Sequence, residues 1–242
     1  MAINVDTVYQ RVLAVANKEQ RGFITPLEFN LLANQAQMEI FEQYFYDLKQ
    51  FGEQHGNDTV HADMLNILQE KIAEFEVHNA AVTSGTTLPT NLYRISSVYH
   101  IASSIQYMAD RLTRKEFEEY RHSPLPMVTI QRPIYLLESG NIEVYTSIDG
   151  GTPSNLTSDV YVNYIKQPDT VYWGYVIVPS TQNGNEYPLN NAATSTNFEL
   201  HPSEETKLVY KILELAGFMM KAPDLAQAAN VKQSQTIQQQ KQ

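Results

Sequence analysis

Apolar residues in the first third of the chain recur at intervals of three and four positions, which is the spacing of one face of an α-helix. This spacing predicts three helices, separated by polar turns at Arg21-Gly22 and at residues 52–59. Helices joined by short loops pack antiparallel, so we expect a helical bundle here. The apolar positions of the first and third helices are Val5, Val8, Val12 and Val15, and then Leu65, Leu68, Ile72 and Phe75.

The second of these helices is the longest and has a clear start signal. Thr25 can cap its N-terminus, Pro26 suits the first helical position, and Glu28 can complete a capping box with Thr25. We expect the helix to end near Gly52. Its main apolar stripe is Leu27, Leu31, Asn34, Met38, Phe41, Phe45 and Leu48, and its second stripe is Phe29, Leu32, Ala36 and Ile40.

Strands are expected in the middle of the chain, at residues 93–101, 134–137, 142–145, 160–165 and 171–178. The turn Ser139-Gly140-Asn141 joins two of them as a hairpin, and Thr113 with Glu116 opens a short helix between others. The last two strands are apolar on both faces, so each should be central in a sheet or covered by a partner. Residues 180–197 are expected to form a long surface loop.

The C-terminal part returns to helical spacing. Ser203 is a natural N-cap, and Glu204 and Glu205 suit the first turn of a helix that is apolar on several sides. Together the elements predict an α+β fold, with an N-terminal antiparallel helical bundle, a central, mostly antiparallel β region, and a C-terminal helix packing back on the bundle. The expected regions are helical 1–81, strand-rich 82–200 with one short helix, and 201–242 with a Gln-rich tail, all within one compact unit.

Composition narrows the classes of function. Hydrophobic residues make up 43% of the 242 residues and charged residues 18%, which is typical of a folded chain. The lack of cysteine excludes disulfides, thiolate ligands and a cysteine nucleophile. No apolar run approaches the ~20 residues of a membrane-spanning helix, and no export signal is expected at residues 1–5. A net charge of −10 without a basic run argues against specific nucleic-acid binding.

A calcium loop is one chemical alternative. Residues 17–29 can be aligned with an EF-hand, with Asn17, Glu19 and Glu28 as ligands and Gly22 at the turn. Arg21 would place a cation beside the ion, and the capping box already accounts for Glu28. We therefore expect no bound metal and no cofactor, and a single EF-hand-like module remains a weaker alternative.

Catalytic motifs are not evident in the sequence. There is no nucleophile elbow, phosphate loop or dinucleotide fingerprint, and the six histidines are scattered without zinc-type spacing. The chain is therefore expected not to be an enzyme, although folding could bring together a site that no local pattern reveals.

Features that suit protein–protein contacts are more evident in the sequence than catalytic ones. Apolar residues on more than one face of the long helix, aromatic strands and fifteen tyrosines suit large, partly wet protein contacts. For Asn34, the polar member of the stripe, two interpretations stay open: an exposed or internally bonded side chain, or a register-setting contact with another helix. The candidate subunit-contact residues are Leu31, Asn34, Met38, Phe41, Phe45, Tyr161, Tyr172, Trp173 and Tyr175.

Two blocks of the sequence carry a family resemblance. Residues 8–52, which include the run from Asn17 to Asn30, and residues 198–232 resemble virion proteins of tailed phages, best known from crAss-like phages of gut Bacteroidales. The resemblance implies a ring or adaptor protein of the head–tail connector, as a ring of about twelve copies stacked on the portal protein and bridging it to further ring or tail proteins. It also implies a virion location, after synthesis in the cytoplasm of the bacterial host.

This role fits the composition, because an acidic ring would let DNA slide through its lumen without binding it. Two other functions remain open. One is a tail-side or fibre-attachment virion protein that docks through residues 160–178, and the other is a monomeric enzyme with an unrecognised site.

Overall fold

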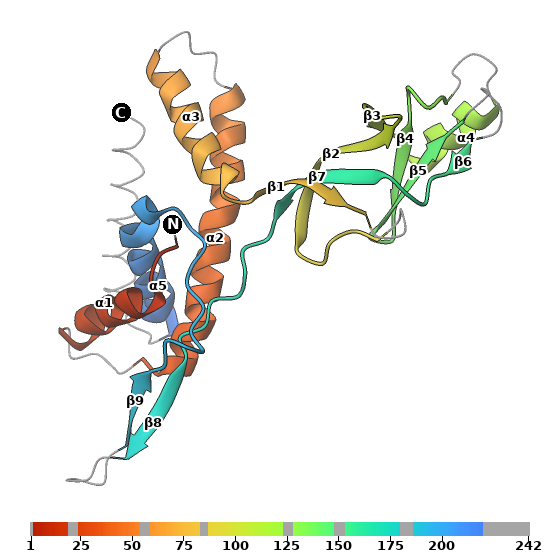
Figure 1. The fold of residues 1–242 in the computed structure, drawn as a ribbon. Coiled ribbons are helices and arrows are strands. Elements are labelled where there is room, and N and C mark those ends of the chain that lie inside the picture. Colours follow the sequence, from red (N-terminus) through yellow and green to blue (C-terminus); the bar gives the residue numbers. More distant parts are fainter. Residues whose placement is uncertain are drawn as a thin grey trace. The chain divides into compact units, whose positions relative to one another are not determined.

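The computed structural model describes residues 2–18, 24–53, 59–82, 87–122, 128–147, 153–179 and 186–219. The protein is mixed α/β, as the sequence predicts (Figure 1). The helices are α1 (Val5–Lys18), α2 (Pro26–Glu53), α3 (Thr59–Ala73), α4 (Arg114–His122), the short 3₁₀ helix η1 (Pro202–Glu204) and α5 (Glu205–Met219). The strands are β1 (Glu76–Ala81), β2 (Leu92–Ala102), β3 (Ile105–Arg111), β4 (Ile134–Glu138), β5 (Asn141–Thr146), β6 (Ser154–Asn155), β7 (Val160–Lys166), β8 (Tyr175–Pro179) and β9 (Glu186–Asn190).

The chain divides into two compact units rather than the expected single one. The first comprises Met1–Glu74 and Pro168–Gln242, and the second is Phe75–Gln167. The expected boundaries at 81/82 and 200/201 differ from this division. The reason is that residues 168–200, which were grouped with the other strands, return to the helices of the first unit, whereas β1 already belongs to the second.

The start of α2 in the first unit follows the predicted capping box. The backbone N–H and the hydroxyl of Thr25 donate to Glu28 Oε2 over 2.9 and 2.8 Å, and the Glu28 N–H donates to Thr25 Oγ1 over 3.3 Å. These bonds satisfy backbone donors that the first turn leaves free, so the helix begins at Pro26. They also hold the pKa of the Glu28 carboxyl below its usual value.

Only part of the apolar surface of α2 is buried. The second stripe lies in the core, but Leu27 and Leu31 of the main stripe are each 66% exposed. The helix contacts α3 and α5, and α1 contacts α5. The largest apolar residues that α2 buries are Phe29, Leu32, Ile40, Phe41 and Tyr44.

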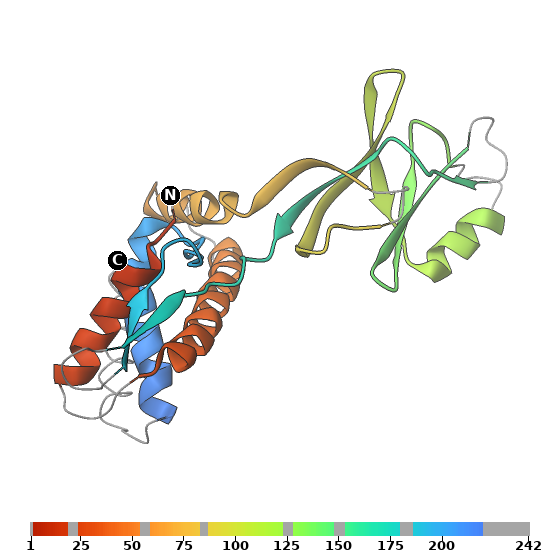
Figure 2. The same cartoon turned by 60° about the horizontal axis from the view of Figure 1, so that its bottom comes forward.

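The second unit is built around a seven-stranded sheet (Figure 2). The strand order is β1-β7-β2-β3-β4-β5-β6. Its pairs are antiparallel except β3–β4, which is parallel. A parallel pair needs a crossover connection, and α4 lies in that connection. The core of the sheet includes Val98, Ile142, Val144 and Val162, and Phe117 of α4 packs with Ile134 and Leu136 in a second cluster.

Most predicted elements of the middle region are confirmed, and several were missed. Strands β2, β4, β5 and β7 and the capping box of α4 match the prediction, and the turn has Ser139 at φ 50° and Gly140 at φ 78°. Strands β1, β3 and β6 were not expected. The expected surface loop 180–197 contains β9, and the expected strand 171–178 becomes regular only at Tyr175.

The C-terminal helix begins with a different cap from the expected one. His201, rather than Ser203, is the N-cap, because its ring accepts a hydrogen bond from the Ser203 N–H ahead of η1. Glu204 is the last residue of η1 and is buried, with 1% of its surface exposed. None of the described helices combines the length and apolar character that crossing a membrane requires.

Candidate assembly surface

Three amide side chains on α2 hold the extended segment that leads into β8. Asn34 is bonded to both backbone groups of Val171, with its Nδ2 donating to the carbonyl and its Oδ1 accepting from the N–H, each over 2.8 Å. Asn30 does the same for Trp173, at 3.4 and 2.7 Å, and Gln37 donates to the Asp169 carbonyl over 2.9 Å. We call Asn30, Asn34 and Gln37 the amide ladder.

The amide ladder works because helix and strand periods nearly match. Four helical residues rise about 6 Å, and two strand residues rise about 6.6 Å. Amides spaced four and three apart on α2 therefore meet every second residue of a strand that runs in the opposite direction. The helix takes the place of a neighbouring strand, and the internally bonded interpretation of Asn34 is confirmed.

Trp173 anchors the same segment in the core. Its side chain is 1% exposed, its Nε1–H donates to Asp6 Oδ1 over 2.9 Å, and its ring lies 4.2 Å from that of Tyr9. Tyr9 in turn meets Phe29 edge to face at 4.8 Å. Helices α1 and α2 thus fix the point from which β8 starts.

The hairpin of β8 and β9 extends past the start of α2 (Figure 1). Asn30, which binds Trp173, is followed toward the N-terminus by only about 6 Å of helix before α2 ends at Pro26. The two strand residues after Trp173 span that length. From Tyr175 onward the strand has therefore left the helix. This explains why Val176, Ile177, Tyr187 and Leu189 are 50–55% exposed although they are apolar.

Alternation along the two strands sorts these side chains by face. Val176 lies opposite Leu189 and Val178 opposite Tyr187, so these four share one entirely apolar face. Among the described residues only β8 and β9 form this small sheet. We call this face the hairpin surface; Ile177, which pairs with Pro188, lies on the opposite face. Exposed apolar surface of this kind marks a site of interaction.

The candidate contact residues are distributed over very different environments. Phe41 and Trp173 lie in the core, and Asn34 is engaged by Val171, so these three do not face outward. Leu31 is exposed and Tyr172 is 45% exposed. The others are half-buried: Met38, Phe45, which meets Phe41 edge to face, Tyr175, which stacks on Trp173, and Tyr161, which stacks on Tyr99 in the second unit.

The sequence reading missed five exposed residues of this region: Leu27, Val176, Ile177, Tyr187 and Leu189. The signal for Val176 and Ile177 was present, because a strand apolar on both faces was expected to need a cover. Tyr187 and Leu189 lie in the segment expected to be a loop, and their alternation there predicts a strand only once the partner β8 is known.

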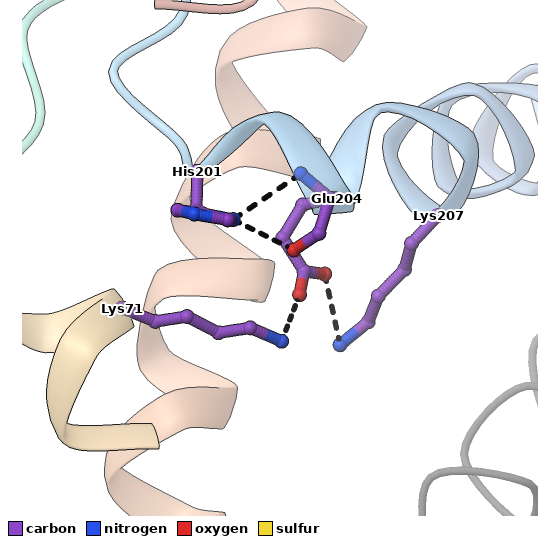
Figure 3. A network of polar contacts seen from close by, with 5 residues as sticks. Lys71, His201, Glu204 and Lys207 are labelled. Atoms are coloured by element: carbon purple, nitrogen blue, oxygen red, sulfur yellow. Dashed lines mark hydrogen bonds and ion pairs between the residues drawn. The ribbon is translucent and has the colours of Figure 1, made fainter. Parts of the chain in front are cut away.

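A buried charge cluster lies elsewhere in the first unit. Figure 3 shows the ammonium groups of Lys71 from α3 and Lys207 from α5 approaching the carboxylate of Glu204. Lys71 is paired with Oε1, and Lys207 Nζ lies 3.7 Å from Oε2. Burial lowers the pKa of Lys207, whereas Glu204 acts to raise it. The nearby phenol of Tyr44 is also buried, which raises its pKa far above the ordinary value.

The geometry of this charge cluster indicates a structural role. Lys71 and Lys207 are only 9% and 7% exposed, and Glu204 is their shared partner, so the group ties α3 to the start of α5. Among the described residues, no three histidine or carboxylate groups are placed to hold a metal ion.

Of the three candidate calcium ligands, the structure describes the side chain of Glu28 alone. The Glu28 carboxylate is engaged by Thr25 in the capping box. Glu19 and the side chain of Asn17 lie outside the described residues.

No protein-family model matches the sequence, and no curated protein matches it either.

Proposed function

We propose that the chain is a non-catalytic structural subunit, and more specifically a ring protein of the head–tail connector in a tailed-phage virion. The observation that carries the proposal is the hairpin surface, an exposed apolar face at the point where β8 has left α2. Interfaces are depleted of charge at their centre and rich in aromatic and aliphatic side chains. The sequence resemblance of residues 8–52 and 198–232 to phage virion proteins supplies the specific role.

A ring requires two different surfaces on each subunit, so that a heterologous contact closes by rotation. The hairpin surface is one candidate. The exposed start of α2, with Leu27 and Leu31 each 66% exposed, is a second. In this proposal the neighbours are further copies of the chain, the portal protein and other ring or tail proteins.

The proposal includes a location in the neck of the virion, an antiparallel packing of the N-terminal helices, and a lumen through which DNA passes. The net charge of −10 supports such a conduit, because an acidic wall repels phosphate and lets it slide. Assembly would start from subunits made in the cytoplasm of the host.

Electron microscopy of purified particles and of the isolated protein tests the proposal. We expect rings of this chain next to the portal. The double variant Val176→Gln, Leu189→Gln should remain folded but fail to enter particles. Tyr46→Gln is the matched control, because Tyr46 is 65% exposed on α2 yet lies outside the hairpin surface. Absence of the protein from particles, or normal incorporation of the double variant, would contradict the role.

A further inference from the structure

The hydrogen-bonding pattern of the β8–β9 hairpin shows which backbone groups face outward. The Asn191 N–H donates to the Gly174 carbonyl over 2.8 Å, in the register that pairs Tyr175 with Asn190. Bonded pairs alternate along an antiparallel ladder, so the backbone groups of 174, 176 and 178 face β9. Those of Tyr175, Ile177 and Pro179 face the opposite edge of β8.

The two edges of the hairpin differ. Pro188 pairs with Ile177 in the register, so its ring nitrogen faces outward from β9 and the middle position of that edge lacks a donor. The edge of β8 presents the N–H and carbonyl groups of Tyr175 and Ile177, and β8 itself carries no charged residue. Charged side chains are a common protection of such edges. The edge of β9 is therefore interrupted at its middle by a proline, and we call the uninterrupted edge of β8 the open edge.

The open edge continues the one that α2 covers. Val171 and Trp173 present their backbone groups on this same side, and there Asn34 and Asn30 bind them. The cover stops where α2 begins, at Pro26. Within the described residues, the outward groups of Tyr175 and Ile177 have no bonded partner.

We propose that the free protein pairs with a second copy of itself through this edge, β8 against β8, antiparallel and centred on Ile177. In that register Ile177 exchanges two hydrogen bonds with Ile177 of the second copy. Each Tyr175 N–H donates to the Pro179 carbonyl of the other chain. The pair of edges then gains four hydrogen bonds. Pro179 takes part only as an acceptor, because proline has no backbone N–H.

Two observations select a second copy and this register. The outward positions of β8 match themselves in this register: no charge meets a like charge, and Pro179, which lacks an N–H, lies opposite Tyr175, whose N–H the Pro179 carbonyl accepts. A register centred on Val176 would place Pro179 of the second copy opposite Trp173, whose backbone groups Asn30 already occupies. Centring on Ile177 uses the five residues Tyr175–Pro179 and stops short of α2.

The paired form also extends the hairpin surface. Two hairpins become one four-stranded sheet, β9-β8-β8-β9, in which the apolar faces of both copies lie on the same side. Val176 lies opposite Val178 of the other copy in the closer, non-bonded type of pair, where β-branched side chains contact well. A two-stranded hairpin alone is marginal in water, whereas four strands with an apolar face are not.

This contact is isologous and produces a closed pair. A ring with all subunits pointing the same way needs heterologous contacts, so the pair belongs to the free protein before assembly. The inference is therefore independent of the proposed virion role, and either can fail alone.

Engineered disulfides test the register without interference, because the chain has no cysteine. Opposite residues of a non-bonded pair have Cα atoms about 4.5 Å apart, which is within the range for a disulfide. A mixture of Val176→Cys and Val178→Cys proteins should therefore form a cross-linked dimer under mild oxidation, and neither variant alone should do so. Cross-linking of Val176→Cys by itself, or no cross-linking in the mixture, would overturn the proposed register.

The open edge itself is tested by Ile177→Pro. This change removes an outward N–H but no bond to β9, so the hairpin should survive, as judged by an unchanged circular dichroism spectrum and melting temperature. In analytical ultracentrifugation we expect the wild type to approach twice the 27.5 kDa of one chain. Ile177→Pro should weaken the dimer about tenfold or more, since two of four bonds are lost.

Ile177→Val is the matched control, because it keeps the N–H and the β-branched shape, and it should dimerise as the wild type does. Monomeric wild-type protein at all concentrations, or an Ile177→Pro variant that dimerises normally, would contradict the pairing.

Discussion

At the scale of single residues, the cluster around Glu204 is the clearest case in which a side chain depends on its partners. One carboxylate lies between two buried ammonium groups, those of Lys71 and Lys207. Removing ions from water is costly, and only the attraction between opposite charges offsets that cost. Glu204 is consequently the member of the cluster that the other two share.

Glu204→Gln should destabilise the protein by roughly 3–5 kcal/mol, since it leaves two buried cations without their shared partner. Lys207→Met should cost much less, because the pair of Lys71 with Glu204 survives. Urea denaturation of both variants, followed by circular dichroism, measures the difference in free energy of unfolding. Equal costs for the two substitutions would show that Glu204 is not the shared centre of the cluster.

Sequence reasoning at this scale succeeded where the partners are near in the chain. The capping boxes of Thr25 with Glu28 and Thr113 with Glu116 each span three residues, and both form. For Glu204 the sequence predicts only a place in the first turn of a helix, where a carboxylate suits the positive end of the helix dipole. Its partner Lys71 is 133 residues away in the sequence, and no local sequence pattern shows that the two residues meet in the fold.

At the scale of elements, the amide ladder shows a helix acting as the neighbour of a strand. A side-chain amide has both a donor and an acceptor, so one Asn can satisfy both backbone groups of one residue. Buried or half-buried backbone groups need such partners. The ladder thus lets residues 169–173 run through the first unit in extended form without a second strand on that side.

Asn34→Ala should destabilise the first unit by roughly 1–3 kcal/mol, since both backbone groups of Val171 lose their partner. Amide hydrogen exchange should accelerate at Val171 and Trp173 in particular. Gln35→Ala is the control, because Gln35 is exposed and its side chain bonds Glu39 on the same helix, and it should change little. Unchanged exchange at Val171 in the Asn34 variant would show that the ladder does not hold this segment.

The ladder was partly visible in the sequence. Asn30, Asn34 and Gln37 share one helix face, and Asn34 stood out as a polar residue among apolar ones. Their partner could not be found, because the strand lies more than 130 residues further along the chain. The apolar spacing of α2 likewise did not show that Leu27 and Leu31 are exposed whereas Phe41 of the same stripe is buried, since that spacing fits two faces and tertiary contacts choose between them.

At the scale of the whole molecule, the chain leaves the first unit after Glu74 and returns to it at Pro168. Local periodicity predicted most of the helices and strands, but not that residues 168–200 belong with the helices. The two ends of the second unit meet, because the Lys166 N–H donates to the Phe75 carbonyl over 2.8 Å. This unit is therefore one continuous stretch of chain with its own core.

The excised fragment Phe75–Gln167 should fold by itself. Its core cluster contains Val98, Ile142 and Val162, all fully buried. We expect a β-type circular dichroism spectrum and a cooperative thermal transition. Val162→Asp in the same fragment should abolish that transition, because an unpaired charge would enter the core. A fragment without cooperative unfolding would show that the second unit depends on the first.

The position of Pro26 has a further consequence. It sets how much strand edge the protein leaves uncovered, because α2 shields backbone groups only as far as its first turn. A helix that began one turn earlier would reach about 5.4 Å further, enough to shield one more pair of strand residues. In the proposed pairing of two copies, an earlier start of this helix would therefore cover part of the edge that the second copy uses, without any change in the hairpin itself.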